Sequence, residues 1–164
     1  FEVPPDFHSI HSTIRKTYKY RIFNSPHPTA LFHRMTEWVY WPMNVDFLNE
    51  ATTHILGTHD FTSFQTSGTQ RKTTVRTIHY AKWTQKSPHF VEFTITGSGF
   101  LKQMVRNIVG TMLDLNRHKR PASEMTKILE ARDRRMAGTT AEARGLSLFK
   151  VYYPQQLDFK SVKI

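Results

Sequence analysis

An amphipathic helix that directly follows a strand constrains the fold of this chain more than any other segment. Residues 89–97 have a strand-like composition, and residues 100–115 then repeat apolar side chains with a helical period. At about 100° per residue, the apolar side chains gather on one half of the helix, whereas Arg106 and Gly110 fall on the other half. A glycine inside a helix costs about 1 kcal/mol relative to alanine. Gly110 therefore indicates that something passes close to the helix near Arg106.

Two interpretations of Arg106 follow from this segment alone. The commoner one is a solvated arginine beside a chance glycine, because most amphipathic helices have such a polar half. The other is a functional arginine, with Gly110 leaving room for a neighbouring part of the protein or for RNA. The rest of the chain decides between them.

The order of the remaining segments predicts an α+β fold. Strand and helix patterns follow one another as β-α-β-β-α-(α)-β, which is typical of a ferredoxin-like split β-α-β sandwich with an antiparallel sheet and helices on one face. The side chains from Val75 to Trp83 should alternate strictly between two faces. Asn44 can cap the first helix, and Gly57 can stop it. We expect strands at residues 16–23, 75–84, 90–96 and 146–153, a short extended piece within 35–41, and helices at 45–56, 100–115 and from 121 onward.

Charge is the most informative part of the composition. The 164 residues include 23 Lys and Arg but only 13 Asp and Glu, which gives a net charge of +10. Such a surplus on one small domain favours a polyanionic partner, most often nucleic acid. No apolar run approaches the roughly 18 residues of a membrane span, so we expect no membrane association. We expect a single domain at residues 1–154 and a tail at 155–164.

The residue types present exclude several kinds of chemistry. The chain has no cysteine, which rules out disulfides and thiolates and is compatible with the cytoplasmic location that we expect. The nine histidines lack the spacing of a zinc site, so no metal is expected. Asp60 follows the first helix, and an acid in such a loop serves as a cap or turn residue more often than as a nucleophile.

Two pairs of aromatic residues have alternative uses. Phe61 and Phe64 could stack on RNA bases or pack in the core. Tyr18 and Tyr20 share one face of the first strand. They are core residues if helices cover that face, and a stacking platform for a base if the face is open. The alternation of the strand leaves both possibilities open.

Taken together, several segments resemble the C-terminal half of the tRNA pseudouridine synthase A (TruA) family. The match is collinear from about Asp6 to Pro154, and two of its elements are specific in themselves. The matching segments are Asp6-Phe-His8, Arg15-Lys-Thr-Tyr-Lys-Tyr20, Gly57-x-x-Asp-Phe-Thr-Ser-Phe64, Val75-Arg-Thr-Ile78, Gly99-Phe-Leu-Lys-Gln-Met-Val-Arg-Asn-Ile-Val-Gly110 and Gly145-Leu-Ser-Leu148.

The resemblance implies a function and roles for two residues. The family converts uridine to pseudouridine at positions 38 to 40 of the tRNA anticodon stem-loop, without a cofactor or metal, and works as a homodimer with the tRNA lying across both subunits. An aspartate is the essential nucleophile or base-displacing group. The tyrosine that matches Tyr18 stacks on the target uracil and is a candidate proton acceptor. The arginine that matches Arg106 forms an ion pair with the catalytic aspartate, which favours the functional interpretation of this residue.

The chain departs from the family pattern in one important way. The catalytic aspartate of the family lies in an Arg-Thr-Asp-x-Gly-Val-His motif, and this sequence contains no such motif. Arg76 and Thr77 are followed by Ile78, and Asp60 lies in a different motif. The start at Phe1 agrees with a chain that begins just before the C-terminal half. We therefore expect the complete protein to be an enzyme and this piece alone to be inactive.

Basic side chains should bind the RNA backbone, since phosphate contacts dominate affinity for nucleic acid. A non-catalytic RNA-binding module of ferredoxin-like fold is an alternative, and a mere dimerisation domain is a third possibility. The candidate RNA-binding residues are Lys16, Lys19, Phe61, Phe64, Arg71, Lys72, Arg76 and Lys102.

Overall fold

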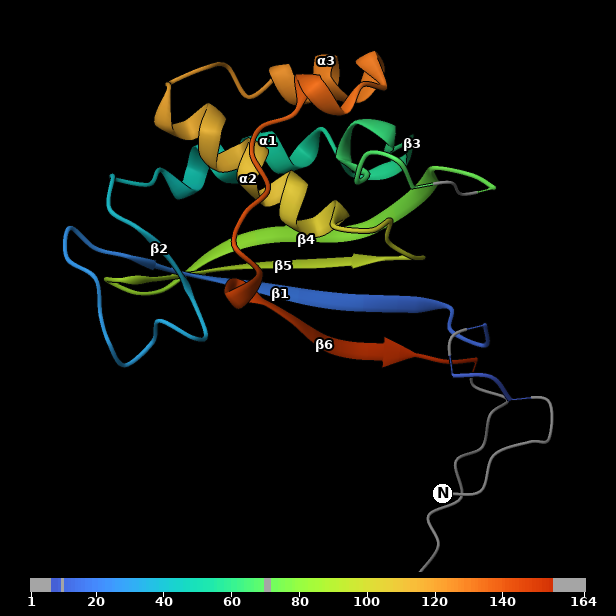
Figure 1. Cartoon of the computed structure of the whole chain (residues 1–164), viewed down its shortest axis with the longest axis horizontal. Coiled ribbons are helices and arrows are strands. Elements are labelled where there is room, and N and C mark those ends of the chain that lie inside the picture. Colours follow the sequence, from blue (N-terminus) through green and yellow to red (C-terminus); the bar gives the residue numbers. More distant parts are fainter. Residues whose placement is uncertain (1–6, 10, 70–71, 155–164) are drawn as a thin grey trace, which may run out of the picture.

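The chain folds as one six-stranded sheet with its helices gathered on one face (Figure 1). The computed structural model describes residues 7–9, 11–69 and 72–154, so the expected tail at 155–164 lies outside the described residues. Within these ranges, no helix combines the length and the apolar character needed to cross a membrane. The predicted α+β class is confirmed.

Most strands and helices fall close to where the sequence patterns place them, but the strand at residues 57–60 was not predicted, and the first helix ends at Thr53 and not at residue 56. The strands are β1 (Arg15–Asn24), β2 (Glu37–Val39), β3 (Gly57–Asp60), β4 (Val75–Ser87), β5 (Phe90–Gly97) and β6 (Leu146–Tyr152). The helices are α1 (Val45–Thr53), α2 (Met104–Arg117) and α3 (Glu124–Ala131).

Strand β1 lies at the centre of the sheet. One of its edges pairs with β5, which continues through β4 to β3. Its other edge pairs with β6 along residues 15–20 and with β2 along residues 22–24. The pairing of β1 with β2 is parallel, whereas all other pairs are antiparallel. The sheet is therefore mixed, and the expectation of a purely antiparallel sheet is wrong at this short strand.

Two further local predictions differ from the structure. The helix expected at residues 100–115 begins only at Met104, because Gln103 has a left-handed backbone with φ of 60° and ends a loop. In β4, an extra residue at His79 shifts the pairing between Ile78 and Tyr80. Because this bulge reverses the alternation, Ile78 and Trp83 both reach the core although one has an even and the other an odd number.

The core lies between the sheet and the helices. Side chains of β1 and β5 meet those of α1 and α2, and Trp83 stacks on Phe93 with ring centroids 4.7 Å apart. The predicted cap of α1 is confirmed, since Asn44 accepts a hydrogen bond from the amide of Phe47 at 3.0 Å. The fully buried side chains include Tyr20, Ile22, Leu48, Phe93, Ile95, Met104, Ile108 and Met112.

Residues 138–141, here called the strap, cross α2 at Gly110. A Cβ atom on Gly110 would lie 1.8 Å from the carbonyl oxygen of Thr139. The amide of Ala141 donates to the carbonyl of Arg106 at 3.1 Å, so the strap is hydrogen-bonded to the helix. The prediction that something passes close to the helix near Arg106 is confirmed. The space beside Gly110 is filled by the chain's own strap, and the expectation that it admits another part of the protein or RNA is wrong.

Polar side chains hold the strap against α2. Arg134 donates to the carbonyl of Gly138 at 2.9 Å and to Oδ1 of Asn107 at 3.2 Å. Thr140 donates to the same Oδ1 atom at 2.6 Å. The amide of Asn107 donates in turn to the carbonyl of Phe64 at 2.7 Å. Asn107 is fully buried, so this network fixes the strap, the helix and the loop after β3 to one another.

Replacing Gly110 with alanine should destabilise the fold by about 2 kcal/mol or more, because the new methyl group meets backbone that cannot move freely. In an unobstructed helix the same change would stabilise the protein by about 1 kcal/mol. A loss of stability would therefore indicate that the strap lies against the helix at this position. Urea unfolding of Gly110→Ala and of a control, Gly99→Ala, would measure it. The control adds a Cβ at an ordinary 3.7 Å contact and should change little. A stabilised Gly110→Ala variant would contradict the role of the strap.

Candidate active site

Tyr18 lies on β1, between Ile95 of β5 and Leu148 of β6. Its ring is half-buried and meets the ring of Phe100 edge-on, with centroids 5.2 Å apart and planes 86° apart. Burial raises the pKa of the Tyr18 phenol, so the hydroxyl stays protonated at neutral pH. Leu148 is 53% exposed, and this leaves an accessible apolar surface beside the ring.

Tyr20 lies on the same face of β1 but is fully buried. Its hydroxyl donates to Oε2 of Glu37 at 2.6 Å and is equally close to the carbonyl oxygen of Glu142. A Cβ on Gly145 would lie 2.6 Å from the Tyr20 ring, so the chain that follows the strap packs directly on it. Burial and then the charge of Glu37 raise the pKa of Tyr20. Tyr20 is therefore a core residue, and Tyr18 is the only one of this pair with a ring available to a ligand.

Arg106 occupies the first turn of α2 and is partly buried. Its Nε atom donates to the carbonyl of Ala141 on the strap at 2.7 Å. Within the described part of the chain, its two terminal nitrogens have no hydrogen-bond or ion-pair partner. The strap thus orients a guanidinium whose outer end remains available to an anion.

The loop between β5 and α2 connects these features. Phe100 packs on Tyr18, and Leu101 is buried beneath the loop. The amide of Thr66 donates to the carbonyl of Lys102 at 3.2 Å, which ties this loop to the one after β3. The left-handed Gln103 then allows the chain to enter α2, three residues before Arg106. The segment from Phe100 to Arg106 therefore connects the Tyr18 ring, on which Phe100 packs, to the guanidinium of Arg106.

Some of the candidate RNA-binding residues surround this loop. The side chain of Arg76 lies 3.7 Å from the position of a Cβ on Gly99. Lys102 is exposed within the loop, and Lys16 lies two residues before Tyr18. Lys72 is exposed between β3 and β4, and Arg71 lies outside the described residues.

Other candidates do not lie near the Tyr18 ring. Phe61 and Phe64 are fully buried in the core, so neither ring can stack on a base, and the expectation that they contact RNA is wrong. Lys19 points to the opposite face of the sheet, because it alternates with Tyr18 along β1. There its Nζ atom forms an ion pair with Glu92 at 3.0 Å.

Asp60 is the last residue of β3 and acts as a turn residue. Its Oδ1 atom accepts hydrogen bonds from the amide and the hydroxyl of Thr62 at 3.0 and 2.6 Å. Burial alone would raise the pKa of this carboxyl group, but hydrogen bonds from Thr62 and Thr74 and the charge of Arg132 lower it. The structural interpretation of Asp60 agrees with these contacts. The described residues contain no group of three or more acidic or His side chains arranged to hold a metal ion.

The strap network was not visible in the sequence analysis. Asn107, Arg134 and Thr140 are far apart in the chain, and neither periodicity nor charge pattern relates them. Only Gly110 indicated that another segment crosses the helix. It predicted where on the helix the segment crosses but not which segment it is. Glu37, whose carboxylate accepts from Tyr20, was also missed because it lies in a three-residue strand.

Comparison with known proteins places the chain among tRNA pseudouridine synthases. A family model described as tRNA pseudouridine synthase matches residues 51–154, which include the loop, α2 and the strap. A tRNA pseudouridine synthase A from Bdellovibrio bacteriovorus is 49% identical over 161 residues, which cover 98% of this chain and 62% of the relative. Enzymes of the same name from Acetivibrio thermocellus and Bacillus subtilis are 42% and 41% identical, over 93% and 90% of this chain.

The chain belongs to the tRNA pseudouridine synthase A family, a family of tRNA-modifying isomerases. It spans about three fifths of the length of these curated relatives, with shares of 62%, 62% and 59%. The resemblance seen in the sequence motifs is thereby confirmed.

Replacing Glu92 with glutamine should destabilise the protein at pH 7 by about 1 to 2 kcal/mol, because it removes the negative charge that Lys19, Arg21 and Lys86 share. Burial would raise the pKa of Glu92, but its hydrogen bonds to Lys19 and Arg21 lower it. A lowered pKa means that this stabilisation is present at neutral pH and is lost as the pH falls below the ordinary range of a glutamate and through the lowered pKa of Glu92.

Thermal unfolding between pH 3 and 8 would therefore show a gap between Glu92→Gln and the unaltered protein that narrows in acid. The control Glu50→Gln, at an exposed position on α1, should show no such gap. A gap that is constant with pH would argue against the ion-pair cluster.

Proposed function

We propose that this chain is the C-terminal domain, residues 1–154, of an enzyme that converts uridine to pseudouridine at positions 38 to 40 of the tRNA anticodon stem-loop. The observation that carries this proposal is the guanidinium of Arg106, which is held by the strap and whose terminal nitrogens have no partner among the described residues. The membership of the chain in its family and its net charge of +10 give independent support.

We infer that the core is a split β-α-β sandwich of the ferredoxin-like type. The order β6-β1-β5-β4, with antiparallel neighbours throughout, supports this inference. Strands β2 and β3 are then additions at the two sides of the sheet.

The reaction is an isomerisation and needs no redox cofactor. The bond between C1′ and N1 of the uridine breaks, and a bond between C1′ and C5 forms. C5 loses its proton and N1 gains one, so atoms and electrons balance within the substrate and solvent. The chemistry requires a carboxylate at C1′ and a surface that holds the detached base.

Arg106 would position the catalytic carboxylate, which this chain does not supply. A partly buried carboxylate near neutral pH needs a cationic partner to remain ionised. The terminal nitrogens of Arg106 can form paired hydrogen bonds with such a group, while its Nε atom remains on Ala141. The aspartate would come from an N-terminal part of the complete protein, so residues 1–164 alone should be inactive.

Tyr18 would stack on the target uracil after the base leaves the stem-loop. The partly buried ring and the adjacent Phe100 and Leu148 provide the apolar surroundings that such a base needs. The raised pKa of Tyr18 keeps its phenol protonated, so stacking requires no change of charge, whereas proton removal from C5 would require the phenolate.

We further propose that Lys16, Lys72, Arg76 and Lys102 contact the tRNA backbone and that the complete enzyme is a homodimer. The alternative is a non-catalytic RNA-binding module. The two differ in the coding sequence upstream, where an Arg-Thr-Asp-x-Gly motif is expected only for the enzyme. A dimerisation domain would bind no tRNA, and filter binding at two salt concentrations distinguishes it.

In the complete enzyme, Arg106→Ala should lower turnover at least about a hundredfold, because an interaction that positions a catalytic group is lost. Affinity for tRNA should fall only modestly. Tritium release from 5-³H-uridine tRNA would measure turnover, and filter binding would measure affinity. Arg117→Ala, at the other end of α2, serves as the control and should keep its activity. Near-normal turnover of Arg106→Ala would remove this residue from the active site.

Tyr18→Phe separates stacking from proton transfer, because the ring is kept and the hydroxyl is removed. Stacking alone predicts turnover close to that of the unaltered enzyme, and Tyr18→Ala should then be strongly impaired. A large loss in Tyr18→Phe would assign the proton-transfer role to the hydroxyl. Single-turnover rates with saturating enzyme would separate either effect from tRNA affinity.

A further inference from the structure

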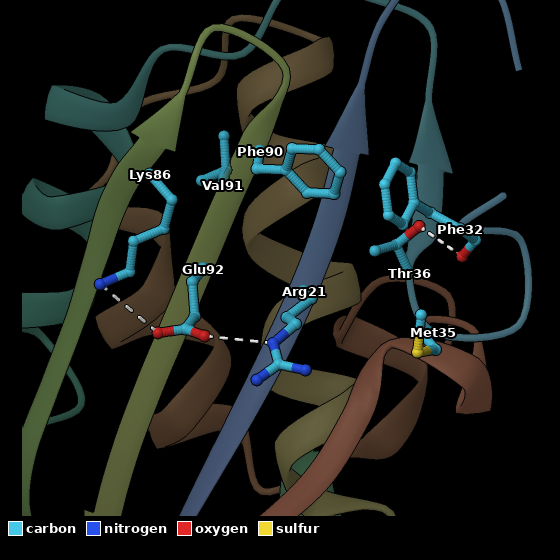
Figure 2. A pocket seen from close by; sticks show the side chains of 8 residues that line it. All are labelled: Arg21, Phe32, Met35, Thr36, Lys86, Phe90, Val91 and Glu92. Atoms are coloured by element: carbon cyan, nitrogen blue, oxygen red, sulfur yellow. Dashed lines mark hydrogen bonds and ion pairs between the residues drawn. The ribbon is translucent and has the colours of Figure 1, made fainter. Parts of the chain in front are cut away.

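The sheet has a second face, here called the open face, which points away from the helices. Figure 2 views this face with the helices behind the strands. Side chains alternate along a strand, so residues 15, 17, 19 and 21 of β1 point to the open face while Tyr18 and Tyr20 point to the helices. The pairing of Lys19 with Thr94 and of Arg21 with Glu92 continues the open face onto β5.

The open face concentrates positive charge. Glu92 is the one carboxylate that the described residues of β1, β4, β5 and β6 contribute to it, and it is shared by Lys19, Arg21 and Lys86 at 3.0, 3.2 and 3.6 Å. Six cations against one carboxylate leave a surplus of five positive charges. The cations are Arg15, Lys19, Arg21, Lys82, Lys86 and Lys150.

Exposed aromatic rings lie among these cations. Tyr80 is 48% exposed and pairs with Thr96, and Phe149 is 58% exposed. The Nζ atom of Lys19 lies 4.1 Å from the centre of the Phe149 ring, and that of Lys150 lies 4.9 Å from the centre of the Tyr152 ring. Cations beside exposed rings on one face of a sheet give an RNA chain both phosphate contacts and stacking surfaces.

A pocket of about 290 Å³ lies at one end of this face. Phe32, Met35 and Phe90 line its apolar part, and its charged side is lined by Arg21, Lys86 and the Glu92 carboxylate with which both cations pair (Figure 2). The rings of Phe32 and Phe90 meet edge-on with centroids 4.8 Å apart. Two cations against one carboxylate leave this border with one positive charge, and an apolar pocket with such a border is suited to an unstacked base whose phosphates remain outside.

We propose that the open face is an RNA-binding surface separate from the Tyr18 site, with the pocket as its receptor for an unstacked base. Charge complementarity selects RNA over a second copy of this chain, because two such faces brought together would oppose five positive charges to five. This proposal depends on the proposed function in one respect, which is that the RNA bound at the open face is taken to be tRNA. A single tRNA bound at the Tyr18 site would need to extend around the edge of the sheet, or reach the open face of another subunit.

The test uses the complete protein and an unmodified tRNA transcript. Lys82→Glu with Lys150→Glu reverses two exposed charges of the open face, and Met35→Glu puts a carboxylate into the pocket. The matched controls are Lys119→Glu with Lys127→Glu, which make the same change of charge on the helical side, and Met136→Glu. Met35 and Met136 are both 55% exposed, so these two substitutions should be tolerated equally.

Filter binding across salt concentrations should show at least tenfold weaker affinity for the double variant and a salt slope smaller by about two, since each lost phosphate contact removes about 0.9. Met35→Glu should also weaken binding, and both controls should stay within twofold of the unaltered protein. Equal effects of the open-face variants and their controls would overturn the proposal.

A change of oligomeric state in the open-face variants alone, measured by light scattering, would also overturn it and would indicate a second copy as the occupant. If the unaltered protein bound no tRNA, the proposed function and this inference would both fail. If it bound tRNA and the open-face variants bound equally well, only this inference would fail.

Discussion

The contact between Gly110 and the strap is the constraint on which the rest of the site depends. At 1.8 Å, a Cβ on residue 110 would occupy the space of the Thr139 carbonyl, so no other residue allows the strap to lie this close to α2. The strap brings the Ala141 carbonyl to Arg106 and continues to Gly145, which packs on Tyr20. One glycine thereby fixes the orientation of the arginine and the point at which the chain enters β6.

Strand β1 separates two kinds of chemistry by alternation alone. Its even-numbered side chains face the helices, where burial keeps Tyr18 neutral and encloses Tyr20. Its odd-numbered side chains face away and place Lys19 and Arg21 beside Glu92. A shift of one residue in the pairing of β1 would exchange these two sets. Pairing along both edges of the strand, with β5 on one side and β6 and β2 on the other, prevents such a shift.

Periodicity predicted most of the fold, because strand and helix patterns depend on neighbours in the sequence. It failed at His79, where a bulge depends on the pairing with β5, and at Phe100, where the loop depends on the ring of Tyr18. Motifs predicted Tyr18 and Arg106 as a pair. Alternation along the strand already placed Lys19 on the face opposite Tyr18, but the sequence did not reveal its ion pair with Glu92, because that contact depends on the pairing of β1 with β5.

The energetics of Arg106 support the proposal that a carboxylate from another part of the protein pairs with it. A partly buried guanidinium loses hydration, and one hydrogen bond to Ala141 returns only part of that free energy. The asymmetry of ion pairs then applies: a charge that is held in place but unpaired is costly, and supplying the opposite charge recovers the cost. The fold has already ordered the arginine through the strap, so an incoming carboxylate would gain its partner without the entropy cost of ordering a flexible side chain. Holding Arg106 in one orientation costs free energy while the guanidinium is unpaired. The same fixed orientation would let it bind and position a carboxylate without further ordering.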